Sequence, residues 1–109
     1  MKPVIWLGDS LERLRAFPSE SMREAGYQLG KVQTGREPSD WKPMPSVGAG
    51  VNELRIRLGG AFRVMYVAKF EEAVYVLHAF QKKSQRTARL DVELARRRHA
   101  NLMHERQVR

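Results

Sequence analysis

Basic side chains and one histidine interrupt the most apolar stretch of the sequence. Arg55 and Arg57 alternate with apolar residues, Arg63 lies within the run AFRVMY, and His78 lies within the run VLHAF. Because a guanidinium keeps its proton in a protein, Arg63 must be solvated, paired internally, or turned toward a site that receives an anion. His78 is either a core histidine bonded to a backbone group or a group that exchanges protons with a substrate. Cations grouped in this way favour chemistry on a phosphate.

Several other kinds of site are excluded by the sequence. It has no cysteine, and its three histidines have no carboxylate at ligand spacing, so no metal centre is predicted. The acids Glu53, Glu71 and Glu72 lie on a strand and at a turn, not in the cluster that a metal-dependent nuclease needs. The segment Gly48-Ala49-Gly50 opens a strand instead of a helix, so it is not a phosphate-binding glycine loop. Chemistry on phosphate without a metal or a cofactor remains.

RNA is a substrate that can be cleaved in this way, because its own 2′-hydroxyl is the nucleophile. The protein must then align that oxygen, stabilise the charged phosphate and exchange protons with the attacking and leaving oxygens. Arginines and lysines that project from one face of a sheet suit this task. The same cations could also bind RNA or the ribosome without cleavage, or form an interface for an acidic protein.

Three β-prone segments carry these residues, at positions 51–58, 61–70 and 73–81. Only two residues separate each segment from the next, so consecutive segments must pair as antiparallel hairpins. The first segment alternates: Leu54, Ile56 and Leu58 share one face, and Glu53, Arg55 and Arg57 share the other. The second and third segments are apolar at nearly every position, which predicts central strands covered on both faces.

The remaining elements are expected to flank this meander. Residues 4–7 form a short apolar strand added to the same sheet. Helices begin at Asp9, which has the capping-box spacing to Glu12, and at Ser19, and together they predict a helical hairpin on one face of the sheet. Residues 34–50 are rich in proline and glycine, which predicts a loop.

A C-terminal helix follows the meander. Thr87 is the expected cap, and Leu90, Leu94 and Leu102 mark the expected apolar stripe. Four further basic residues in this region could follow a phosphate backbone: Arg86, Arg89, Arg96 and Arg97.

Composition and charge set the broad class. A chain of 109 residues makes one domain, and a net charge of +8 indicates a polyanionic partner, either nucleic acid or an acidic protein. Most of the excess lies in residues 82–109, which hold nine Lys or Arg and three Asp or Glu. No apolar run approaches the ~20 residues of a membrane helix, and the N-terminus does not resemble a signal peptide. A cytoplasmic protein is expected.

The order of short motifs adds a resemblance to a known family. The segments ELR at 53–55, FRVMY at 62–66 and LHAFQKK at 77–83, followed by ELA at 93–95, resemble the phage-derived Gp49-like, HigB-type branch of the RelE toxin superfamily. The resemblance implies the toxin of a type II toxin-antitoxin pair, an mRNA interferase that cleaves messenger RNA on the ribosome. It also implies a single RelE-like toxin domain over residues 1–109, in the α+β class: a small antiparallel sheet with two N-terminal helices and one C-terminal helix. The expected partner is a helix-turn-helix antitoxin encoded by the adjacent gene.

Site residues follow from the resemblance, position by position. Arg63 and Lys82 are expected to hold the scissile phosphate, and Arg55 and Arg57 to stabilise the transition state or a neighbouring phosphate. The tyrosine that some members carry near the C-terminal helix has no counterpart between Gln81 and Arg109. The proton-transfer role therefore stays open between His78 and Lys83.

Overall fold

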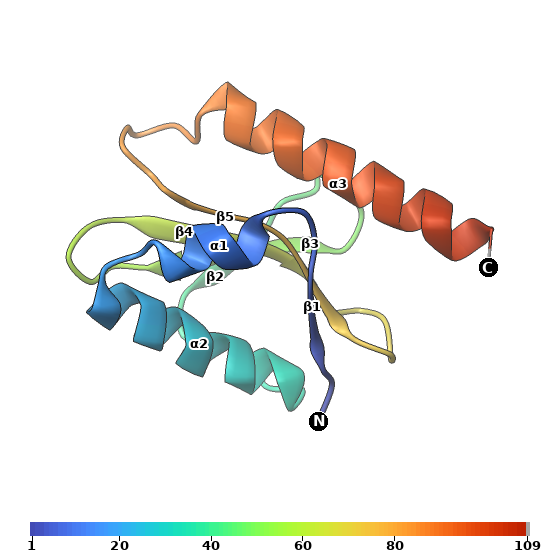
Figure 1. Ribbon diagram of the computed structural model, residues 1–109, viewed down its shortest axis with the longest axis horizontal. Helices are drawn as coiled ribbons and strands as arrows, with labels where there is room; N and C mark the ends of the chain where they lie inside the picture. Colours follow the sequence, from blue (N-terminus) through green and yellow to red (C-terminus); the bar gives the residue numbers. More distant parts are fainter. Residues whose placement is uncertain (109) are drawn as a thin grey trace.

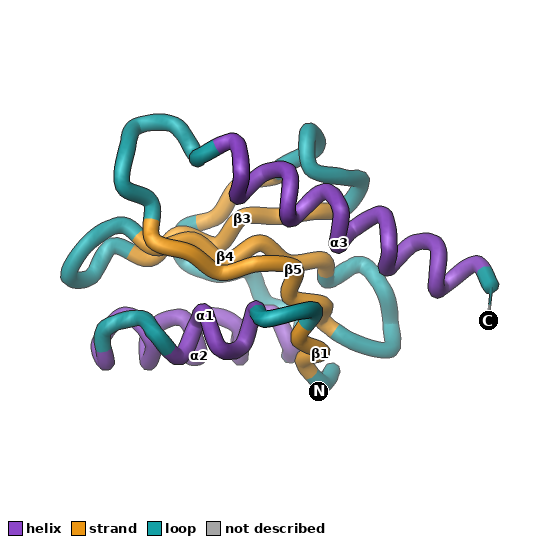
Figure 2. The backbone as a smooth tube through the Cα atoms, turned by 45° about the horizontal axis from the view of Figure 1, so that its top comes forward, coloured by secondary structure: helices purple, strands orange, loops and turns teal. Residues whose placement is uncertain are grey.

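The computed structural model, which describes residues 1–108, is built on one five-stranded sheet with the strand order β1-β5-β4-β3-β2. Helices α1 and α2 cover one face of the sheet, and α3 crosses the other (Figure 1, Figure 2). The mainly antiparallel α+β fold expected from the sequence is thus confirmed. The elements are β1 Val4–Trp6, α1 Ser10–Arg15, α2 Ser19–Gln33, β2 Trp41–Pro43, β3 Val51–Ile56, β4 Phe62–Val67, β5 Val74–Gln81 and α3 Arg89–Gln107.

The meander forms as predicted. Strands β3, β4 and β5 pair antiparallel in sequence order, every residue of β4 is buried, and all residues of β5 except Gln81 are buried. Two central strands covered on both faces explain why these segments are apolar at nearly every position. The short strand β1 joins the same sheet by pairing with β5 in parallel.

The turn between β3 and β4 is longer than the two residues predicted. The last paired residues are Ile56 and Phe62, so five residues make the connection, and Gly59 and Gly60 have φ angles of 67° and 140°. These are angles that glycine adopts most readily. Leu58 lies in this loop and is exposed, so its predicted place on the apolar face of the strand was wrong.

The prediction of an uninterrupted loop over residues 34–50 was also wrong. Residues Trp41–Pro43 form the edge strand β2, which pairs antiparallel with β3. The sequence of a three-residue strand that contains a proline does not favour β structure. Such a strand forms because it pairs with its neighbour. Pro43 is tolerated because it lies on an edge, where a missing donor costs little.

Helix α3 packs on the sheet through only part of the predicted stripe: Leu102 is buried and Leu94 is partly buried as predicted, but Leu90 is not. Ala95 is buried in a cluster against which Val92 packs, whereas Leu90 is 78% exposed. At about 100° per residue, Leu90 and Val92 lie on nearly opposite sides of the helix. The residue before the helix is Ala88, and no side chain caps it, so the expected cap at Thr87 does not form.

An arginine of α3 ties this helix to the start of α1. Arg98 donates from Nη1 to the carbonyl oxygen of Leu77 at 2.9 Å and from Nη2 to Oδ1 of Asp9 at 2.6 Å. Leu77 is the extra residue where the β4–β5 register shifts. Gly8 allows the close approach, because a Cβ there would lie 2.6 Å from Cζ of Arg98. The side chain of Asp9 therefore binds Arg98 of α3. The predicted capping box at the start of α1 does not form, because the Asp9 side chain makes no capping hydrogen bond.

This tie predicts how stability depends on pH. The hydrogen bonds from Arg98 and then Arg13 lower the pKa of Asp9 from 3.8 to about 2. A carboxylate whose folded pKa is depressed stabilises the fold above its unfolded pKa, and the contribution is lost as the pH falls through the folded pKa. We expect Asp9→Asn to lower the free energy of unfolding by about 1 kcal/mol or less at pH 7, because Asp9 is partly exposed.

Urea denaturation at pH 7 and pH 2 measures this effect. The difference between wild type and Asp9→Asn should shrink at pH 2, and Glu12→Gln, which removes an exposed carboxylate of α1, should show neither effect. An equal difference at both pH values would contradict the role given to Asp9.

Candidate nucleic-acid interface

The register of the meander places the candidate residues in rows across the α3 face of the sheet. Arg55 pairs with Arg63, and Arg63 pairs with Phe80. Residues directly opposite one another on neighbouring strands project to the same face. Lys82 follows two residues after Phe80, at the end of β5, and its backbone nitrogen donates to the carbonyl oxygen of Ala61 at 2.7 Å. We call Arg55, Arg63, Phe80 and Lys82 the basic row.

Glu53 holds the two arginines of the basic row. Its Oε1 lies 3.3 Å from Nε of Arg55 and 3.5 Å from Nε of Arg63. Glu53 and Arg63 are 1% and 4% exposed, and the Arg55 side chain is 23% exposed. Of the alternatives open for Arg63, the structure therefore shows internal pairing. Arg63 also donates from Nη1 to the carbonyl oxygen of Phe62, at 3.1 Å.

The pairing of these groups is incomplete. Among the residues that the structure describes, Oε2 of Glu53 and Nε of Arg63 are buried without a hydrogen-bond partner. Burial lowers the pKa of Arg63, and the charge of Glu53 opposes that shift. A guanidinium stays protonated nonetheless, so the sheet contains a fixed cation close to its surface.

His78 lies one row further in, under α3. It is fully buried, its Nε2 lies 2.7 Å from Oδ1 of Asp91, and its ring stacks on Phe80 with centroids 5.1 Å apart. The expected alternative of a bond to a backbone group is replaced by a bond to a carboxylate of α3. Burial lowers the pKa of His78, and the bond to Asp91 opposes that shift. Asp91 is partly exposed and connects His78 to the surface.

The other predicted cations are spread around this region. Arg57 is exposed and lies 3.4 Å from a carboxylate oxygen of Asp40. Lys83 does not continue the basic row; it lines a hollow at the free edge of β5 that Phe80 also borders. The exposed Arg86 belongs to the segment that leads into α3, and the exposed Arg89 is the first residue of α3 and pairs with Glu93 of the same helix.

Arg96 and Arg97, about 100° apart around α3, have different surroundings. Arg96 donates from Nε to the carbonyl oxygen of Ser46 at 2.7 Å and so fixes the loop before β3. Arg97 lines a hollow beside Leu7 and Gly8. Neither residue belongs to the basic row, although both are exposed.

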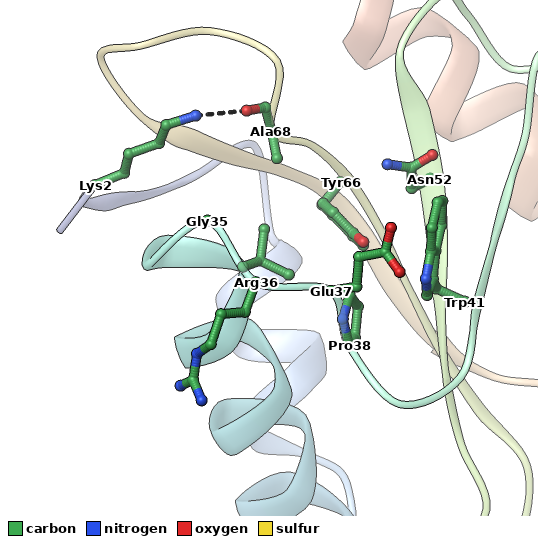
Figure 3. Close-up of a pocket in the computed structure, with 10 residues that line it drawn as sticks. Lys2, Gly35, Arg36, Glu37, Pro38, Trp41, Asn52, Tyr66 and Ala68 are labelled. Atoms are coloured by element: carbon green, nitrogen blue, oxygen red, sulfur yellow. Dashed lines mark hydrogen bonds between the residues drawn. The ribbon is translucent and has the colours of Figure 1, made fainter.

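A separate hollow of about 220 Å³ lies on the opposite face of the sheet, beside the end of α2 (Figure 3). Trp41, Tyr66, Asn52 and Glu37 line it, and burial raises the pKa of Tyr66 to about 12. None of the residues predicted from the sequence as site residues lines this hollow.

Three residues that contact the candidate site residues were not predicted from the sequence. Glu53 carried a usable signal, because it precedes Arg55 by two residues and shares its strand face. Asp91 carried none, because its bond to His78 depends on where α3 crosses β5. Phe80 was identified only as an apolar neighbour of His78.

The fold and the basic row together define a small α+β protein with a candidate anion-binding face. The chain belongs to the phage-derived protein Gp49-like family (DUF891), whose model matches residues 12–100. No curated protein matches the chain in a sequence comparison. Within residues 1–108, no group of histidine, cysteine or acidic side chains could hold a metal ion, and no helix has the length and apolarity of a membrane span.

The position of Glu53 predicts a large effect on stability. Glu53→Gln keeps the shape but removes the charge between Arg55 and Arg63, so we expect the free energy of unfolding to fall by about 3 kcal/mol. Adding Arg63→Met should restore part of the loss, because it removes the unpaired buried cation. Guanidinium denaturation measures both effects, and Glu71→Gln at an exposed turn should stay within about 0.5 kcal/mol of wild type. A fully stable Glu53→Gln would contradict this account.

His78 predicts a pH dependence near neutrality. Because its folded pKa is lowered, the unfolded chain takes up a proton more readily, and stability should fall as the pH drops through 6.5. We expect His78→Asn to lose this pH dependence, whatever its absolute stability, while the exposed His104→Asn keeps it. Denaturation at pH 7.5 and pH 5.5 tests the prediction. The same loss of stability in wild type and His78→Asn would show that His78 is not its source.

Proposed function

We propose that the chain is the toxin of a type II toxin-antitoxin module, a RelE/HigB-type mRNA interferase that cleaves translated messenger RNA on the ribosome and stops growth. One observation carries the proposal: Arg55 and Arg63 lie directly opposite each other on β3 and β4, with Lys82 at the adjoining end of β5. Membership in the Gp49-like family agrees with it. Cations fixed before the substrate arrives stabilise a developing phosphate charge without reorganisation.

The residues have distinct proposed roles. Arg63 and Lys82 hold the scissile phosphate, and Arg55 and Arg57 stabilise the pentacoordinate transition state or the next phosphate. The 2′-hydroxyl of the RNA attacks, so neither a metal nor a small-molecule cofactor is required. Proton exchange falls to Lys83, which is exposed, or to His78, which communicates with solvent through Asp91.

The proposed partners follow from the same assignment. They are messenger RNA and the ribosome in the cytoplasm, and an antitoxin with a helix-turn-helix encoded by the adjacent gene. The strongly basic charge suits polyanionic RNA. An antitoxin that neutralises the toxin would cover the basic row or the segment that leads into α3.

A second candidate is a basic RNA-binding or ribosome-binding module of the same fold without catalysis. The burial of Arg63 and His78 favours it, because both side chains are 4% exposed or less. The exposed cations of this region would then only neutralise phosphates, and affinity would fall steeply with salt.

Expression in a bacterial host, with mapping of the 5′ ends of cellular messages, separates these candidates. Wild type should arrest growth and create new ends inside coding frames, and the adjacent gene should reverse both effects. Arg55→Ala and Arg63→Ala should lower cleavage by about 100-fold, the scale for losing one transition-state donor. The matched control is Arg23→Ala, an exposed arginine of α2 on the opposite face, which should remain toxic.

The outcomes are distinct. Arrest without new ends would favour the binding module, and full toxicity of Arg63→Ala would overturn the catalytic assignment. Circular dichroism must show that Arg63→Ala is folded, because Glu53 would lose a partner. Arg55→Ala, at a more exposed position, provides the second test.

A further inference from the structure

The far end of β5 has an open edge. Strand β1 pairs only with Val74 to Val76, whereas β5 continues to Gln81. Within residues 1–108 no strand covers the last residues of β5 on that side, and the end of α1 and the start of α3 lie beside them. A hollow of about 370 Å³ remains there. This size is within the range of pockets that bind small ligands.

The lining of this hollow combines aromatic rings with polar groups. Phe17 and Phe62, with ring centroids 4.6 Å apart, line it together with Phe80, and each of the three is 8% exposed or less. Arg13 and Lys83, both exposed, supply positive charge. Aromatic surfaces beside cations are the combination that binds a single unstacked base and its flanking phosphates.

Gln81 gives the hollow a group that can read a base. It is the one exposed residue of β5, and it lines the hollow. Its amide nitrogen is held close to the β3–β4 turn, 3.4 Å from where a Cβ on Gly60 would lie. A glutamine amide offers a donor and an acceptor side by side, which match the N6 and N7 positions of adenine.

The hollow adjoins the basic row. Gln81 lies between Phe80 and Lys82 in the chain, about 3.3 Å per residue along the strand. Asp91 lines the hollow and also binds His78, so one carboxylate contacts both places. A base in the hollow would therefore be next to the phosphate that the basic row is proposed to hold.

We propose that this hollow, the Gln81 pocket, binds one unstacked base of the RNA substrate and that Gln81 determines which base is accepted, with adenine as the expected match. Lys83 and Arg13 bind the phosphates that flank this base. The inference rests on the proposed function, because the RNA in question is the substrate of the interferase.

Cleavage of short messenger RNAs that differ at one position, translated on ribosomes, tests the role of Gln81. Wild type should cleave the RNA with adenine at one position relative to the cut about 10-fold faster than the others, within the discrimination of a bidentate amide–adenine pair. Gln81→Ala should lose this preference while still cleaving the slower substrates at the wild-type rate. Lys83→Ala should slow all substrates alike, and Gln107→Ala, an exposed glutamine at the end of α3, should change nothing.

Binding of mononucleotides separates failure of the pocket from failure of the proposed function. Adenosine monophosphate, titrated into ¹⁵N-labelled protein, should shift the side-chain amide signal of Gln81 more than uridine monophosphate does. If the protein cleaves no RNA but this shift appears, the pocket stands and the endonuclease assignment fails. If RNA is cleaved with the same base preference in wild type and Gln81→Ala, or if neither nucleotide shifts the Gln81 signal, the Gln81 pocket is overturned.

Discussion

The buried carboxylate of Glu53 is the group on which the basic row depends. Two arginines directly opposite each other on neighbouring strands repel, and such a pair is destabilising unless an opposite charge lies between them. Glu53 lies within 3.5 Å of both Arg55 and Arg63 and is itself almost fully buried. The Glu53 carboxylate offsets the repulsion between the two arginines and also holds their side chains in position, so the cations are in place before any anion binds.

Helix α3 joins the interior of the sheet to its surface. Arg98 anchors the helix to Asp9 and to the carbonyl oxygen of Leu77, where the β4–β5 register shifts. With α3 held in this position, Asp91 reaches the buried ring of His78. The position of α3 therefore determines both where the exposed basic segment before the helix lies and which groups the helix covers on the sheet.

The sequence predicted elements whose structure follows from neighbouring residues, and it did not predict elements whose structure depends on packing against distant parts of the chain. The central strands β4 and β5 were identified because burial on both faces leaves a nearly continuous apolar run. The edge strand Trp41–Pro43 was missed because its conformation comes from pairing with β3. Leu90 was placed in the core because an apolar residue at helical spacing does not reveal which side of the helix meets the sheet.

The sequence by itself determined the meander, the helical hairpin, the concentration of positive charge near the C-terminus and the shared strand face of Glu53 and Arg55. These are consequences of side-chain alternation, turn residues and composition, which act over a few neighbouring positions. Only the tertiary structure decided that Arg63 is paired with Glu53, that His78 binds Asp91, and that Lys83 lines the Gln81 pocket. Each contact depends on the register between strands, on where α3 crosses the sheet or on where β1 ends. Such long-range packing cannot be recognised from the residue types at the positions it brings together.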